Sequence, residues 1–310
     1  MVFYIVAFFL FGLIFGSFLN VCIHRMPLGL SVVRPRSACP GCQTPIAAHD
    51  NIPVLSWVLL KGKCRHCQTR ISPRYAVVEL LTGTFFALSY YLTVTRFDAT
   101  PGLLAAKYCI LSFLLIGLIF TDAETRLLPD LLTKPGIVLG LLFSLFVAVE
   151  GPAGFFLQSW VHHAVNWRLV SLINAFAGAT AGSAFILAVS LIYKAVRGEE
   201  GMGFGDVKLM ALIGAFLGVR LTLLVVLLGS LIGSILGVAL ILLVWRKRLA
   251  RRRSKVPTEP VKIARTRSWR SAILIYRNFQ IPFGVFLGGA ALFTAFWGNA
   301  AFRWYWELVW

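Results

Sequence analysis

Long apolar runs alternate with shorter polar connections along the 310 residues of the chain. Several runs reach the roughly 20 residues that a helix needs to cross a bilayer. We expect spans at residues 2–21, 77–94, 103–121, 131–149, 172–193, 207–219, 221–244 and 281–297. The pattern therefore predicts an all-α polytopic membrane protein with about eight transmembrane helices.

Two of the expected spans need a separate argument. The first lacks a basic leader and ends at Cys22-Ile23-His24-Arg25 without a small-residue cleavage site, so we expect it to stay as a spanning helix. Run 207–219 is short, roughly 20 Å at about 1.5 Å per residue, and we expect a short crossing helix.

The polar segments then divide the chain. The expected units are a first helix (1–23), a cysteine-containing loop domain (24–75), a membrane core (76–245), a basic loop (246–280), and a last helix with an aromatic tail (281–310). No internal repeat is expected.

Composition agrees with a membrane protein, with 58% hydrophobic and 14% charged residues and a mean hydropathy of +0.81. The formal net charge of +18 would suggest nucleic acid in a soluble protein. Here the Lys and Arg residues gather in loops, so we expect a topology signal and contact with anionic lipid, and no nucleic-acid partner. By the same rule the odd-numbered loops are cytoplasmic and both termini are outside.

Three polar or aromatic stretches have modest expected roles. The basic stretch 246–262 contains Pro257 and Pro260 and is expected to be mobile. His162 and His163 could bind metal, but an interfacial surface helix is favoured because tryptophans flank them. The tail 302–306 is typical of an aromatic belt at the outer interface.

Four cysteines form two CxxC pairs separated by 21 residues, Cys39 with Cys42 and Cys64 with Cys67. This spacing is typical of a zinc ribbon, in which two knuckles place four thiolates around one ion. A cytoplasmic loop is reducing, which argues against disulfides, and zinc would supply most of its folding energy. A thioredoxin-like redox role is the weaker alternative, and His66 is expected to be a spectator.

Two further cysteines, Cys22 and Cys109, lie inside apolar runs and are expected to be buried small hydrophobes.

Two aspartates are the candidate catalytic pair. Asp206 follows the glycine-rich run 201–205 and opens an expected span, while Asp122 ends another on the same side of the membrane. Glycines let an extended peptide approach closely. Two carboxylates at one depth can share a proton, one acting as base on water and the other as acid on the carbonyl oxygen, and neither role is assigned to either residue. The alternatives without catalysis are that Asp206 caps a helix and that Asp122 lies at a helix end exposed to water.

Other acidic residues near these positions have simpler interpretations. Asp130 is favoured as a helix N-cap, and Glu124 is expected to be solvated. Glu79 could orient the cysteine loop, bind a cationic amine or pair with an arginine.

Taken in order, these motifs resemble the bacterial prepilin peptidases, or type IV leader peptidases. The resemblance covers most of the chain and rests on Gly16-Ser17-Phe18-Leu19-Asn20-Val21, on Pro35-Arg36-Ser37 before the first knuckle, on Ile71-Ser72-Pro73-Arg74-Tyr75, on Leu128-Pro129-Asp130 after Asp122, and on Gly203 to Lys208 with Gly214-Ala215-Phe216-Leu217-Gly218. In Pro282-Phe283-Gly284-Val285, a valine stands where the family commonly has proline, and we expect a mild effect.

The resemblance implies a bifunctional enzyme of the bacterial cytoplasmic (inner) membrane. Such enzymes cleave the leader from prepilins and pseudopilins on the cytoplasmic side, with the aspartates matching Asp122 and Asp206 as the catalytic pair. Many also methylate the new amino terminus with S-adenosylmethionine, an activity associated with the cysteine loop. No Rossmann-type fingerprint is visible, and no residue is assigned to binding this cofactor.

Two other classes of function remain as alternatives. An ion-coupled transporter or channel would use the aspartates as a relay, but it predicts carboxylates nearer the bilayer middle and leaves the cysteine loop unexplained. A non-catalytic scaffold of a secretion system would use the zinc loop for recruitment and would keep its function when Asp122 is replaced by Asn.

Overall fold

The computed structural model describes the chain except residues 97–100, 153–165, 199–202, 256–259, 279–281 and 310. In the described part the regular elements are helices: α1 (Val2–Arg25), α2 (Leu55–Leu59), α3 (Arg74–Arg96), α4 (Pro101–Thr125), α5 (Asp130–Ser144), α7 (Trp167–Arg197), α8 (Phe204–Lys255), α9 (Val261–Asn278) and α10 (Phe283–Val309), with short 3₁₀ turns at Met26–Leu28 and Ala48–Asn51. The fold is therefore the expected all-α membrane architecture. Gly201 and Met202 of the glycine-rich run, and Trp160, His162 and His163, lie outside the described residues.

Six described helices are long and apolar enough to cross a membrane: α1, α3, α4, α7, α8 and α10. The count differs from about eight for two reasons. Helix α5 has only 15 residues, and α8 joins two of the expected spans into one 52-residue element.

Helix α8 reverses direction at Gly218, which has the non-helical angles φ 76° and ψ 172°. On α7, Gly178 faces Gly214 and Gly218 of α8, and Gly182, one turn later, faces both Met210 and Thr222. The first part of α8 is therefore antiparallel to α7 and the second part parallel to it. Only glycine adopts these angles without strain, so the short run at 207–219 and the next run are two arms of a helical hairpin.

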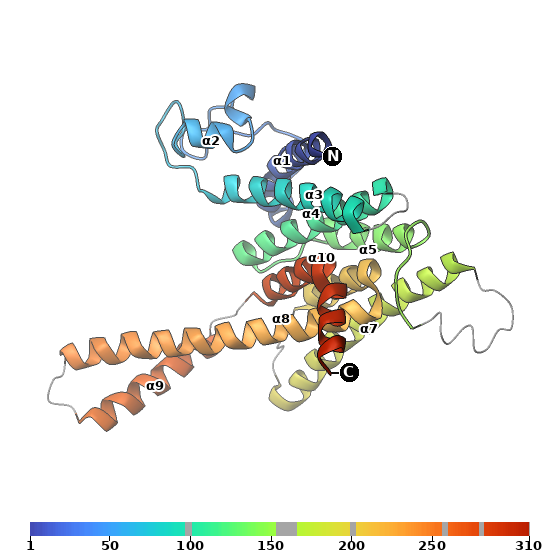
Figure 1. The fold of residues 1–310 in the computed structure, drawn as a ribbon. Coiled ribbons are helices and arrows are strands. Elements are labelled where there is room, and N and C mark those ends of the chain that lie inside the picture. The colour runs from blue at the N-terminus through green and yellow to red at the C-terminus, as the bar shows by residue number, and fades with distance from the viewer. Residues whose placement is uncertain (97–100, 153–165, 199–202, 256–259, 279–281, 310) are drawn as a thin grey trace.

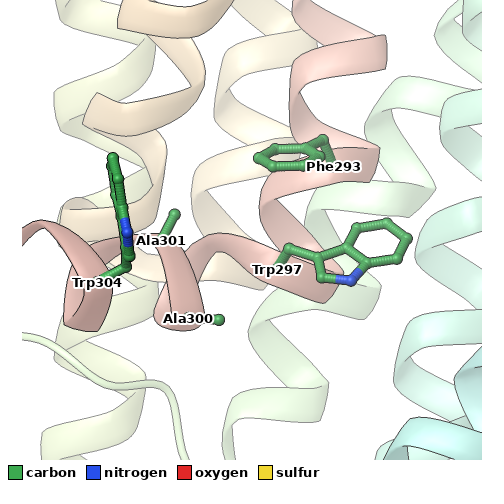
Figure 2. Close-up of a pocket in the computed structure, with 5 residues that line it drawn as sticks. All are labelled: Phe293, Trp297, Ala300, Ala301 and Trp304. Carbon is green, nitrogen blue, oxygen red and sulfur yellow. The ribbon is translucent and has the colours of Figure 1, made fainter.

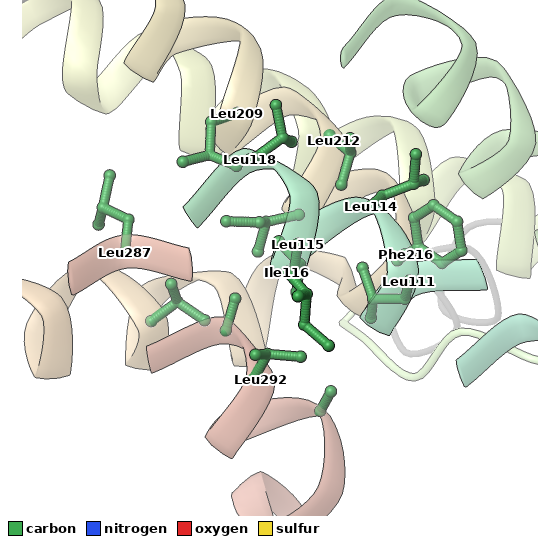
Figure 3. Close-up of a cluster of buried hydrophobic side chains, with 14 of the residues drawn as sticks. Leu111, Leu114, Leu115, Ile116, Leu118, Leu209, Leu212, Phe216, Leu287 and Leu292 are labelled. Atoms are coloured by element: carbon green, nitrogen blue, oxygen red, sulfur yellow. The ribbon is translucent and has the colours of Figure 1, made fainter. Parts of the chain in front are cut away.

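Helix α4 lies at the centre of the bundle and packs against α1, α3, α5 and α10, while α8 packs against α5, α7, α9 and α10. The shared core is formed chiefly by fully or nearly buried apolar side chains from α4, α8 and α10 (Figure 3), including Leu111, Leu115, Ile116, Leu209, Leu212 and Leu287. This core fixes the ends of α4, α8 and α10 relative to one another, and those ends carry the candidate catalytic residues.

Two parts project from the bundle (Figure 1): the segment with α2, between α1 and α3, and the pair formed by the end of α8 with α9. The described residues of the basic stretch are helical, since α8 continues to Lys255 and α9 begins at Val261, and its mobility stays a prediction. Arginine, lysine and alanine favour helix. Trp245 and Trp269 pack edge to face at 5.8 Å and hold α9 against α8.

Candidate active site

Asp122 and Asp206 converge, although 84 positions separate them in the sequence. Asp122 lies near the end of α4 and Asp206 in the first turn of α8, and their exposed fractions are 5% and 9%. Asp122 therefore does not end its helix in water. Asp206 does not cap α8 either, because the helix begins two residues earlier, at Phe204.

Distances measured from Gly284, at the start of α10, set an upper limit on the separation of the two carboxylates. A Cβ atom added to Gly284 would lie 2.8 Å from Asp122 Oδ2 and 3.4 Å from Asp206 Oδ1. The two oxygens are thus no further apart than the sum of these distances, about 6.2 Å. Carboxylates within this limit are close enough to act on the same water molecule or peptide carbonyl group. The lack of a side chain at Gly284 leaves this space open.

The backbone of α10 also contacts the pair directly. The N–H of Val285 donates a hydrogen bond of 3.1 Å to Asp122 Oδ2. Sequence reasoning missed this contact, because it assigned Val285 only a mild effect. The one available signal was the position of Gly284-Val285 two residues after Pro282, near the beginning of an apolar run.

Neighbouring charged residues hold the surrounding helices together. Asp130 is the first residue of α5, with Pro129 at the N-cap, so the N-cap interpretation of Asp130 is wrong. Its carboxylate pairs with Lys134 at 2.7 Å and with Lys208 of α8. These contacts fasten α5 to the first turn of α8, next to Asp206.

Glu124 and Glu79 connect α3 to other parts of the chain. Glu124 is exposed to solvent, as expected, and it also pairs with Arg74 of α3. Glu79 is 7% exposed and accepts a 2.7 Å hydrogen bond from the Val54 N–H. Of the roles considered for Glu79, this contact supports orienting the cysteine loop.

The four paired cysteines form one cluster. Their Sγ atoms all lie within 4.8 Å of one another, and those of Cys39 and Cys67 are 3.6 Å apart. Four sulfurs bound to zinc at about 2.3 Å in a tetrahedron are separated by about 3.8 Å. The cluster could therefore hold a metal ion, and His66 is not among the clustered ligands.

Each knuckle has the same backbone hydrogen bonds. Cys39 N–H donates to Thr44 C=O at 3.0 Å, and Cys64 N–H donates to Thr69 C=O at 2.9 Å. The sequences 39–46 and 64–71 share the pattern C-x-x-C-Q-T-x-I. The expectation of no internal repeat is therefore wrong, because two short knuckles related in this way escape a search for longer repeats.

The threonine of each knuckle promotes ionisation of the second cysteine. Hydrogen bonding with the side chain and backbone of Thr69 lowers the pKa of Cys67 to about 6, and Thr44 likewise lowers the pKa of Cys42. Thiolates are the form that binds metal. Cys67 thus favours the metal-binding form at neutral pH, and the pKa of Cys42 is shifted in the same direction.

A shallow apolar pocket of about 430 Å³ lies at the opposite end of α10 from Gly284 (Figure 2). It is lined by Phe293, Trp297, Ala300, Ala301 and Trp304. The pocket offers little polar lining and no titratable group, so it adds nothing to the chemistry of the two aspartates.

Comparison with known proteins covers most of the chain. Residues 10–93 match the profile of the bacterial peptidase A24 N-terminal domain, and residues 109–238 match that of the type IV leader peptidase family. The first match contains the cysteine cluster. The second contains Asp122 and Asp206.

Several proteins named prepilin leader peptidase/N-methyltransferase are similar to the chain. The one from Aeromonas salmonicida strain A449 is 36% identical over 96% of this chain and 92% of its own length. Those from Klebsiella pneumoniae and Neisseria gonorrhoeae are 42% and 38% identical over 68% and 67% of this chain, and over 83% and 72% of their own lengths. No solved structure matches the chain. Because both family profiles match, and because one relative is similar along nearly its entire length, this protein belongs to the type IV leader peptidase family.

Proposed function

We propose that the protein is a membrane-embedded aspartyl endopeptidase that removes the leader peptide of type IV prepilins and pseudopilins and then N-methylates the new amino terminus. The observation that carries the proposal is the convergence of two buried carboxylates, Asp122 and Asp206, on the open space at Gly284. The names of the relatives supply the substrate class and the second activity.

In the proposed mechanism the two aspartates share one proton, because two close buried carboxylates cannot both be ionised cheaply. The ionised member takes a proton from water as the water oxygen attacks the scissile carbonyl carbon. The protonated member donates its proton to the carbonyl oxygen, giving a neutral tetrahedral diol. The C–N bond then breaks as the amine nitrogen takes the proton from the first aspartate and a diol hydroxyl returns one to the second.

The position of the pair at helix ends suits a substrate with an apolar helix and a polar leader. The substrate helix would lie in the bilayer, and its leader would stay at the cytoplasmic surface, where water is available. This arrangement supports cleavage at the cytoplasmic face of the bacterial inner membrane. It also disfavours an ion relay, which needs carboxylates deeper in the bilayer.

The cysteine cluster is the proposed zinc site, held by Cys39, Cys42, Cys64 and Cys67. A zinc ion held by these four cysteines would have no position open to substrate, which is the arrangement of a structural site. S-adenosylmethionine is the proposed methyl donor, and it would supply a methyl group to the newly released amine. The proposal of methylation rests on the relatives' names and on the resemblance.

The test uses the purified protein in lipid with a prepilin and S-adenosylmethionine, and the mass of the product is measured. The wild type should remove the leader and add one methyl group. Asp122→Asn and Asp206→Asn should each leave the precursor uncut. Asp130→Asn is the matched control, since it removes a carboxylate that is paired with lysines beside the site, and it should still cleave.

Two results would contradict the proposal. Cleavage that survives either substitution of the pair would exclude the paired-aspartate mechanism. Cleavage without the added methyl group would leave the peptidase intact and exclude the N-methyltransferase.

A further inference from the structure

The two candidate catalytic carboxylates have different surroundings, and the difference comes from α10. This helix begins at Phe283, so the N–H of Val285 is among the first four, which have no acceptor within the helix. That N–H instead donates to Asp122 Oδ2 at 3.1 Å. The N-terminus of a helix also carries partial positive charge, so it favours the ionised form of a carboxylate placed there.

Gly284 makes this contact possible. Its added Cβ would lie 2.8 Å from Asp122 Oδ2 and 3.2 Å from Asp122 Cγ, but 3.4 Å from the nearest oxygen of Asp206. Asp122 is therefore the carboxylate seated more closely against the first turn of α10. Any side chain at position 284 would push it away from the N–H of Val285.

The other charged groups around the pair either also favour an ionised Asp122 or form ion pairs with one another. Arg126, the residue after the last residue of α4, is near enough to Asp122 to interact with its charge. From α8 the facing group is Asp206, which favours a single negative charge on the pair. Two ion pairs complete the surroundings, Arg74 of α3 with Glu124 of α4 and Lys208 of α8 with Asp130 of α5.

We infer that the first turn of α10 makes Asp122 the ionised member of the pair, with the backbone N–H of Val285 as its positioning group. Asp206 then carries the shared proton. This inference rests on the proposed peptidase function. Asp122 is then the base that takes the proton from water. Asp206 is the acid that protonates the scissile carbonyl oxygen.

The first test replaces Val285 by proline, which removes the N–H. Proline is tolerated in the first turn because the N–H it lacks has no helical acceptor. We expect kcat to fall by about tenfold, the loss of one hydrogen bond to a charged group, with KM changed by less than about twofold. Val285→Ala, which keeps the N–H, should recover most of the lost kcat. A Val285→Pro enzyme with wild-type kcat, or an equal loss in Val285→Ala, would overturn the role of the N–H.

The second test needs no activity and remains available if Val285→Pro does not fold. The infrared band of a protonated carboxyl group is followed as the pH is raised in the wild type, Asp206→Asn and Asp122→Asn. The band should disappear at a lower pH in Asp206→Asn, where Asp122 keeps the N–H of Val285, than in Asp122→Asn, where Asp206 remains. The reverse pattern, or the same effect from both substitutions, would overturn the assignment. If the wild type does not cleave prepilin, the proposed function fails, while the infrared pattern still decides which carboxyl group carries the proton.

Discussion

The cysteine domain should depend on its metal ion for folding, because it has almost no apolar core. Among residues 26–73 the buried ones are Cys39, Ser56, Gly62 and Cys64, and none of them is a large apolar side chain. Each fully buried Leu, Ile or Val contributes about 1.5–3 kcal/mol to folding, and this domain lacks that contribution. A structural zinc ion in small zinc-binding peptides contributes about 10–16 kcal/mol at pH 7.

The perturbation is Cys64→Ser, which removes one of the four clustered ligands. We expect about one zinc ion per chain in the wild type and loss of zinc in the variant, measured by elemental analysis. Hydrogen exchange followed by mass spectrometry should show loss of protection at the knuckle amides of Cys39, Gln43 and Gln68, which donate to backbone carbonyls. Amides of α4 should keep their protection, because their helix is packed in the membrane core.

The matched control is Cys109→Ala, which removes a buried thiol outside the cluster. It should keep the zinc and the protection of both knuckles. If Cys64→Ser kept the protection of the knuckles, or if the metal-free wild type did so after chelation, then the domain would fold without a metal ion and the argument from its missing core would be refuted.

The remaining predictions concern pH and packing. Zinc should be released on acidification: the stability that ionised Cys67 contributes is greatest above the ordinary thiol pKa of about 8.5 and is lost as the pH falls through about 6, which a zinc-sensitive dye can follow. Leu212→Ala should destabilise the bundle by about 2–5 kcal/mol, because this side chain of α8 is fully buried, and denaturant unfolding in detergent measures the loss. Gly178→Val should cost about 1–3 kcal/mol in the same assay, since a Cβ there would lie 2.8 Å from Gly218 Cα, whereas Gly102→Ala, with no atom within 4 Å, is its control. An undiminished stability of Gly178→Val would mean that the hairpin does not pack on α7 as described.

The carboxylates at the site show the limits of local sequence patterns. Asp122 and Asp206 were predicted to meet because apolar periodicity and loop charge place both at one end of spanning helices. The same reasoning gave the wrong role to Asp130, whose position after a proline is typical of an N-cap. Its lysine partner Lys208 lies 78 positions away, so no local pattern could indicate the pairing.

The sequence by itself determined the membrane class, the position of nearly every long helix and the four clustered cysteines, because apolar run length and CxxC spacing are local properties of the chain. Only the tertiary structure decided three further features: the reversal of α8 at Gly218, the orientation of the cysteine loop by Glu79, and the contact of α10 with Asp122. Each of them depends on which helices lie side by side. Packing of the shared core settles that choice, and it brings together residues that the sequence keeps far apart.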